Sequence, residues 1–186
     1  MIDPQDATLA DLARIKNRAE LITGRIVLLP YLGHKPGVAM AKFLISLQKY
    51  IEAMGRGHVL MSKLAYEVPK LVSGRESFSP NASYYDGPLP EDPWAFIPGP
   101  PTLAVEIRSI DAYGPEVGAE RATKRGDYFA AGTLFVWDVD ALNETVQTYR
   151  PGPCARPLTF RRGEVANAEP AVPGWRMAVD EIFAVA

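Results

Sequence analysis

The chain has 186 residues, of which 47% are hydrophobic, and its 20 basic and 22 acidic residues give a formal net charge of −2. This length supports one domain with a sizeable core. The charge balance excludes strong nonspecific binding of nucleic acid over the whole surface, although it allows a local basic cleft. A lone cysteine, Cys154, excludes a disulfide framework and a cysteine zinc site.

Targeting and zinc-binding signals are both weak in this sequence. The chain has no apolar run of membrane-spanning length, and Met1–Asp6 lacks the basic start and apolar stretch of a signal peptide. We therefore expect a cytoplasmic protein with no membrane partner. The two histidines, His34 and His58, are too few and too isolated for a zinc site.

The first third of the chain predicts a short helix, a hairpin and a long helix. Thr8 is a candidate N-cap for a helix over residues 8–13, with an acidic residue three positions on. The segment Glu20–Leu29 has two apolar stretches around a Thr-Gly turn, which is typical of a β-hairpin. Apolar residues then recur at helical spacing from Pro36 to Met54, and Gly55 ends this helix.

Strands dominate the rest of the chain. The loop Asp86–Pro101 carries six prolines in sixteen residues, and its aromatic residues Trp94 and Phe96 are candidates for partner contacts or a packed lid. Strand–helix–strand order after this loop favours a parallel βαβ unit beside antiparallel hairpins, and hence a mixed α/β sheet. The expected elements are strands over about Gly57–Pro69, Pro80–Tyr85, Thr102–Arg108, Thr133–Val139 and Glu144–Tyr149, a helix over Pro115–Ala131 closed by Gly132, and a last strand pair and apolar turn within Leu158–Ala186.

A carboxylate, Glu106, stands in the middle of an apolar run that indicates a buried strand. Burying an ionised carboxylate costs several kcal/mol unless a cation or a donor meets it. Alternate strand residues share a face, so Glu106 and Arg108 point the same way. Lys124 and Tyr128 share one stripe of the next helix. If the strand from Pro80 pairs with this one, Asn81 reaches the same end of the sheet.

These residues resemble the Uma2 (Uma-two) family of restriction endonuclease-like proteins, which belongs to the PD-(D/E)XK nuclease superfamily. The resemblance rests on Pro80-Asn81, on Glu106-Ile107-Arg108-Ser109, on Lys124 with Tyr128 four residues later, on the strand Phe135-Val136-Trp137-Asp138, on Glu20–Ile26, on the helix after His34 and on the ending from Pro173 to Phe183. It implies one α/β domain over residues 1–186, with a core of about 20–183. The implied fold is a restriction-endonuclease-like mixed β-sheet flanked by helices, with an N-terminal hairpin.

The resemblance further implies a Mg²⁺-dependent endonuclease that hydrolyses DNA phosphodiester bonds, with Mn²⁺ as a substitute ion and a homodimer as the assembly. Mg²⁺ prefers hard oxygen ligands, usually one or two carboxylates. The implied roles are metal ligation by Glu106 and Asn81, catalysis by these two residues with Lys124 as charge stabiliser, and substrate binding by Arg108, Tyr128 and Glu20.

One departure from the family pattern bears on activity, because an aspartate is expected where this chain has Asn81. A neutral amide oxygen replaces a carboxylate there, and one charge pair near a surface amounts to about 4 kcal/mol. The resemblance therefore predicts a nuclease weakened or inactivated at this position, either naturally or by an engineered change. The alternative is a catalytically silent nuclease-fold binding or assembly protein. A third reading is a phosphate-binding protein without hydrolysis, using the helix N-terminus after Ser109.

Structural roles for the same residues stay open at this point. Glu106 could simply pair with Arg108 or Lys124, and Lys124 could instead form a solvent-exposed helix pair with the glutamate four residues before it. Asn81 after a proline is often a turn residue that bonds its own backbone. Tyr128 is more often a core residue than a catalytic one, and a strand-start glutamate such as Glu20 can pair locally.

Overall fold

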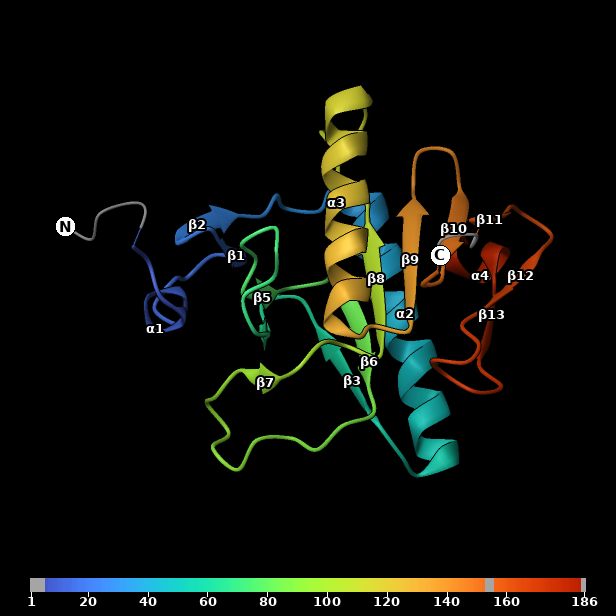
Figure 1. Cartoon of the computed structure of the whole chain (residues 1–186). Helices are drawn as coiled ribbons and strands as arrows, with labels where there is room; N and C mark the ends of the chain where they lie inside the picture. Colours follow the sequence, from blue (N-terminus) through green and yellow to red (C-terminus); the bar gives the residue numbers. More distant parts are fainter. Residues whose placement is uncertain (1–5, 153–155, 185–186) are drawn as a thin grey trace.

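The computed structural model describes residues 6–152 and 156–184, so Cys154 lies outside the described residues. Its centre is a six-stranded sheet in the order β11-β10-β9-β8-β6-β3, with helices on both faces (Figure 1). These strands are β3 (His58–Met61), β6 (Ala82–Tyr85), β8 (Leu103–Ile107), β9 (Phe135–Asp140), β10 (Thr145–Tyr149) and β11 (Leu158–Phe160). The helices are α1 (Leu9–Leu12), α2 (His34–Met54), α3 (Pro115–Ala131) and α4 (Val179–Phe183).

Three smaller sheets surround this centre, and the N-terminal one is the predicted hairpin. Their strands are β1 (Ala19–Ile22) with β2 (Arg25–Leu28), β4 (Tyr66–Glu67) with β5 (Ser77–Phe78) and β7 (Ile97–Pro98), and β12 (Val165–Asn167) with β13 (Arg176–Ala178). Thr23 and Gly24 both have positive φ at the hairpin turn, 51° and 69°, as a two-residue turn of this hand requires. None of the described helices combines the length and apolar character needed to cross a bilayer.

The predicted βαβ unit is confirmed. β8 and β9 pair in parallel, with Glu106 opposite Asp138, and α3 connects them. The neighbouring pairs β6–β8 and β9–β10 are antiparallel, so the sheet is mixed. α3 has the predicted bounds and ends at Gly132, whose φ of 112° suits glycine.

The alternation of side chains along β8 sorts the core into two layers. Leu103 and Val105 pack with α2 residues on one face, whereas Ala104 packs with Tyr128 of α3 on the other. On the α2 face, Trp137 is fully buried, with its ring 5.5 Å from that of Phe43. The sheet is therefore covered on both faces, and α3 is held above the carboxyl end of β8.

Two expectations from the sequence need correction. The predicted strand over residues 57–69 is two strands, β3 and β4, which belong to different sheets. The chain turns between them, where Lys63 has a φ of 78° and the main-chain N–H of Ser62 donates to the carbonyl of Asn81. The proline-rich loop is not wholly irregular, since β7 within it pairs in parallel with β4.

Replacing Phe43 with alanine should lower the free energy of unfolding by about 3–5 kcal/mol, because a fully buried ring is lost from the α2 face of the sheet. The matched control on the same helix is Ile45→Ala, at a residue that is 56% exposed, with an expected change within about 0.5 kcal/mol. Chemical denaturation followed by circular dichroism measures both. Equal losses in the two variants would contradict this account of the core.

Candidate active site

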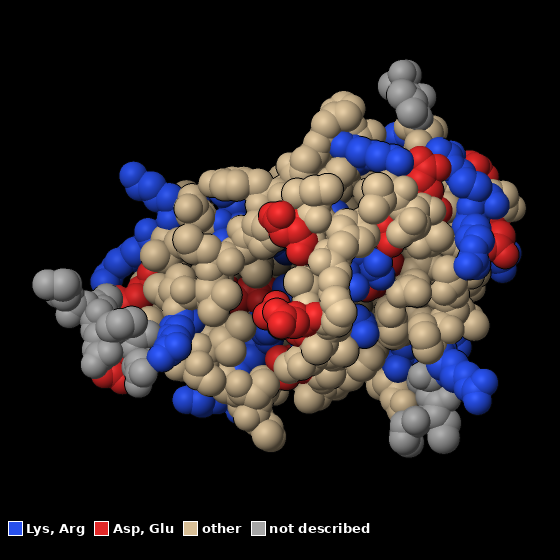
Figure 2. Space-filling view, turned by 90° about the horizontal axis from the view of Figure 1, so that it is seen from above, with Lys and Arg blue, Asp and Glu red and all other residues tan. Residues whose placement is uncertain are grey.

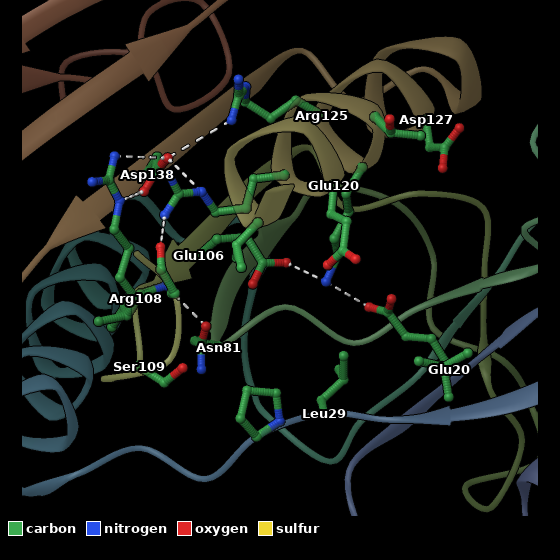
Figure 3. A pocket seen from close by; sticks show the side chains of 18 of the residues that line it. Glu20, Leu29, Asn81, Glu106, Arg108, Ser109, Glu120, Arg125, Asp127 and Asp138 are labelled. Atoms are coloured by element: carbon green, nitrogen blue, oxygen red, sulfur yellow. Dashed lines mark hydrogen bonds and ion pairs between the residues drawn. The ribbon is translucent and has the colours of Figure 1, made fainter. Parts of the chain in front are cut away.

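A pocket of about 600 Å³ opens between α3, the carboxyl end of β8 and the β1–β2 hairpin. Its lining includes Glu20 from β1, Asn81 just before β6 and Glu106 from β8 (Figure 3). Lys124 and Tyr128 line it from α3. The structure thus brings together residues that lie far apart in the sequence. Figure 2 views the molecule from above, and there blue and red side chains are interspersed rather than gathered into one basic surface.

Lys124 joins two carboxylates inside this pocket. Its Nζ lies 2.7 Å from Oε1 of Glu20 and 2.8 Å from Oε1 of Glu106. The Tyr128 hydroxyl donates to the same Glu106 oxygen at 2.7 Å. The second Glu106 oxygen, Oε2, lies 3.5 Å from Nη2 of Arg18. Lys124 therefore supplies the cation that a carboxylate in this strand requires.

Glu20 is the most deeply buried acid of the site, with a side chain only 1% exposed. It accepts hydrogen bonds from the main-chain N–H of Ser79 at 2.8 Å and from Arg75. Arg75 also donates to Asp127 of α3 at 2.8 Å. Burial alone would raise the pKa of Glu20, but Lys124 and Arg75 outweigh it and lower the pKa to about 2.

Tyr128 acts as a hydrogen-bond donor rather than a base. Its side chain is fully buried, and the ring stacks on Phe78 with centroids 4.2 Å apart. Burial and the neighbouring carboxylates of Glu106 and Glu20 raise the pKa of this phenol well above its usual value. Tyr128 consequently belongs to the core and to the site at once, holding the Glu106 carboxylate in one orientation.

Asn81 links β6 to β8 and does not bond its own backbone as a turn residue would. Its side-chain Oδ1 accepts from the main-chain N–H of Ile107 at 2.9 Å, and its main-chain N–H donates to the carbonyl of Val105 at 3.1 Å. The amide Nδ2 is buried and has no hydrogen-bond partner among the described residues. Asn81 lines the pocket and carries this buried donor.

Arg108 also lines the pocket, but its guanidinium faces β9 and β10 rather than Glu106. It donates to Asp138 at 2.7 Å and 3.2 Å, to Asp140 at 2.7 Å and to Gln147 at 3.3 Å. The sequence offers Arg108 and Lys124 as ion-pair partners for Glu106, and the structure shows Lys124 in that role. Arg108 instead balances the acids of the neighbouring strand.

Several residues of this site carry no clear signal in the sequence. Arg18, Arg75 and Asp127 lie in polar segments that resemble many others, and long-range folding alone brings them to the pocket. Asp138 could have been found, because it is an acid inside a buried strand just as Glu106 is. Its register position opposite Glu106 puts both carboxylates on one face of the sheet.

Residues 7–180 match the model of the Uma2 family, which is described as "Putative restriction endonuclease". The chain belongs to the Uma2 family. No curated protein matches the chain.

A solved structure shares the fold of this Uma2 chain. It is a crystal structure of a "putative nuclease belonging to DUF820" from Anabaena variabilis ATCC 29413, with a TM-score of 0.74 and 17% identity. The match covers 95% of this chain and 97% of the other. At 17% identity, this likeness shows the fold alone. The chain therefore has the fold of a nuclease-like α/β protein.

Membership of the Uma2 family implies a divalent metal ion. Such an ion would need free oxygen atoms among the pocket residues. The Asn81 oxygen is used by the Ile107 N–H, and Oε1 of Glu106 already meets Lys124 and Tyr128. Within the described ranges, no group of three His, Cys, Asp or Glu side chains is placed to hold a metal. Mg²⁺ is usually held by one or two carboxylates with several waters. Here both Glu106 oxygens already lie beside cations, Oε1 by Lys124 and Oε2 by Arg18, so these residues as they stand do not fit a Mg²⁺ site.

The low pKa of Glu20 predicts acid sensitivity. A carboxyl whose pKa falls from 4.5 to about 2 on folding contributes on the order of 3 kcal/mol above pH 4.5, and this contribution is lost as the pH falls toward 2. Glu20→Gln should therefore destabilise the protein at pH 7, with a difference from the natural chain that shrinks across this range. Urea unfolding from pH 7 to about 2.5 measures it. A constant difference at every pH would contradict the assignment.

Proposed function

We propose that the pocket around Glu106 and Lys124 engages DNA phosphodiesters, and that Asn81 keeps Mg²⁺-dependent hydrolysis far below the level that a carboxylate at position 81 would give. The observation that carries this proposal is the convergence of Glu106 and Lys124, 2.8 Å apart, in an open pocket of a Uma2-family fold. An acid and an amine held together beside a cleft are suited to charge stabilisation in phosphoryl chemistry.

The side chains around Glu106 would each act on a bound phosphodiester in a simple way. Lys124 is 16% exposed and reaches the pocket, so its ammonium can lie against a phosphate oxygen. Arg18, 12% exposed, adds a second cation on the other side of Glu106. Tyr128 and Lys124 together fix the orientation of the carboxylate, which limits the reorganisation needed when substrate arrives.

Asn81 is the residue that separates binding from hydrolysis in this proposal. Aspartate has nearly the shape of asparagine, so one of its oxygens could keep the bond from the Ile107 N–H. The other oxygen would then take the place of the unpartnered Nδ2. An aspartate would thus put a second carboxylate in the lining of the pocket that holds Glu106, in place of the buried donor of Asn81, and oxygen ligands of this kind suit Mg²⁺.

The decisive variant is therefore Asn81→Asp. It should cleave supercoiled plasmid with Mg²⁺ or Mn²⁺ at least about 100-fold faster than the natural chain, because an added charge near a surface site is worth about 4 kcal/mol before screening. Gel analysis of initial rates measures the ratio. The control is Asn81→Asp combined with Glu106→Gln, which should return cleavage to the level of the natural chain.

Two other outcomes would change the assignment. Equal cleavage by the natural chain and Asn81→Asp would mean that position 81 does not limit the reaction. Absence of cleavage by both folded proteins would favour the second candidate, a catalytically silent nuclease-fold protein that binds DNA or assembles with a partner. The donor at position 81, which does not suit Mg²⁺, is the observation that supports this second candidate.

We also propose that residues 1–186 form one domain that assembles as a homodimer. Trp94, which is 90% exposed in the proline-rich loop, is the candidate dimer contact. Sedimentation of the natural chain and of Trp94→Ala tests this assembly, and a monomeric natural chain would contradict it.

A further inference from the structure

Three arginines surround one aspartate at the β9 side of the pocket. Asp138, whose side chain is 4% exposed, lies 2.7 Å from Nε of Arg108, 3.8 Å from Nε of Arg121 and 3.7 Å from Nη1 of Arg125. Figure 3 shows Arg108 and Arg125 reaching toward Asp138, away from Glu20. One carboxylate therefore gathers three guanidinium groups, although hydrogen-bond distances join it to Arg108 alone.

Arg121 and Arg125 consequently keep donors that other groups do not use. Arg121 donates through Nη1 to the carbonyl of Ala112 at 2.6 Å, but its Nε is buried without a partner among the described residues. The Arg125 guanidinium lies over the ring of Tyr149, 4.1 Å from its centroid. This contact holds the group in place without occupying its N–H donors.

The balance of charge differs between the two sides of the pocket. In the ion-pair series around Glu106, the carboxylates Glu20, Glu106 and Asp127 meet the cations Lys124, Arg18 and Arg75, and Glu120 lines the same part of the pocket (Figure 3). Around Asp138, three arginines form ion pairs with Asp138 and Asp140. Asp140 also accepts from Tyr113 and from Asn143. Within this cluster the cations exceed the acids by one, so an anion is drawn to it locally, although the whole pocket lining has six basic and six acidic residues.

We propose that Arg121 and Arg125 form a phosphate subsite, which holds a phosphate of the DNA strand next to the one at Glu106 and Lys124. This inference rests on the proposed function and deepens it. Guanidinium forks match phosphate oxygens in a bidentate way. Arg121 and Lys124 are three residues apart on α3, so their Cβ atoms lie about 5–6 Å from each other. That spacing lets a single DNA strand place successive phosphates along α3, at Arg121 and at Lys124.

The double variant Arg121→Gln/Arg125→Gln tests the subsite. Binding of a fluorescein-labelled DNA duplex is measured by anisotropy in EDTA, across about 50 to 200 mM salt. We expect about tenfold weaker binding at the lowest salt, and a slope of log K against log[salt] that is smaller by about 1 to 2. The matched control is Arg161→Gln/Arg176→Gln, which removes two exposed arginines outside the pocket and should change neither quantity.

A second variant, Arg125→Lys, tests the subsite even if the double variant does not fold. Arg125→Lys keeps the charge and loses the planar fork, so binding should weaken by about threefold while the salt slope stays the same. Thermal melting by circular dichroism checks both variants. If the double variant does not fold, unchanged binding by Arg125→Lys overturns the proposal, and the predicted weakening supports it.

Calorimetry with inorganic pyrophosphate separates the subsite from the proposed function. DNA binding that is equal in the natural chain and the double variant overturns the subsite and leaves the proposed function standing. If the natural chain binds no DNA but binds pyrophosphate, and the double variant does not, the subsite stands and the proposed function falls. If the natural chain binds neither probe, both fall.

Discussion

One ammonium group between two carboxylates is the constraint on which this site depends. Lys124 meets Glu20 from the N-terminal hairpin and Glu106 from the central sheet, and leaving the buried Glu20 carboxylate without a cation would be costly. The pairing continues on both sides, as an alternating series that runs Asp127, Arg75, Glu20, Lys124, Glu106 and Arg18. Because its members come from the hairpin, the sheet and α3, the same series that fixes the chemistry also fixes how these elements meet.

Position 81 shows how one side chain can serve the fold through one atom while its other polar atom stays without a partner among the described residues. The structural task of this residue is to join β6 and β8 through one side-chain oxygen, and an amide oxygen does this as well as a carboxylate would. The remaining atom carries the difference, because Nδ2 is a donor with no partner among the described residues. The bond to Ile107 therefore constrains one half of the side chain, and the proposed function depends on the other half.

The pocket also explains how an acidic protein could meet a polyanion. With a net charge of −2, the whole surface offers no long-range attraction to DNA. Within the cleft, whose lining has six basic and six acidic residues, the ion-pair network around Glu106 lies beside a cluster in which three arginines meet two aspartates. A low-dielectric wall strengthens such a local field. The arginines proposed to attract DNA and the residues proposed to act on it therefore line the same cavity.

The sequence by itself determined the elements whose signals are local: the hairpin at its Thr-Gly turn, α3 between its proline and Gly132, and the parallel unit around it. It also determined that Glu106 in an apolar strand would be costly unless a cation or a hydrogen-bond donor met it. Only the tertiary structure decided that Lys124 supplies the cation and that Arg108 turns to Asp138. The tertiary structure also decided that the Asn81 amide oxygen accepts from Ile107 while Nδ2 has no partner among the described residues. These pairings depend on contacts between residues far apart in the chain, and such contacts leave no spacing or periodicity in the sequence from which they could be predicted.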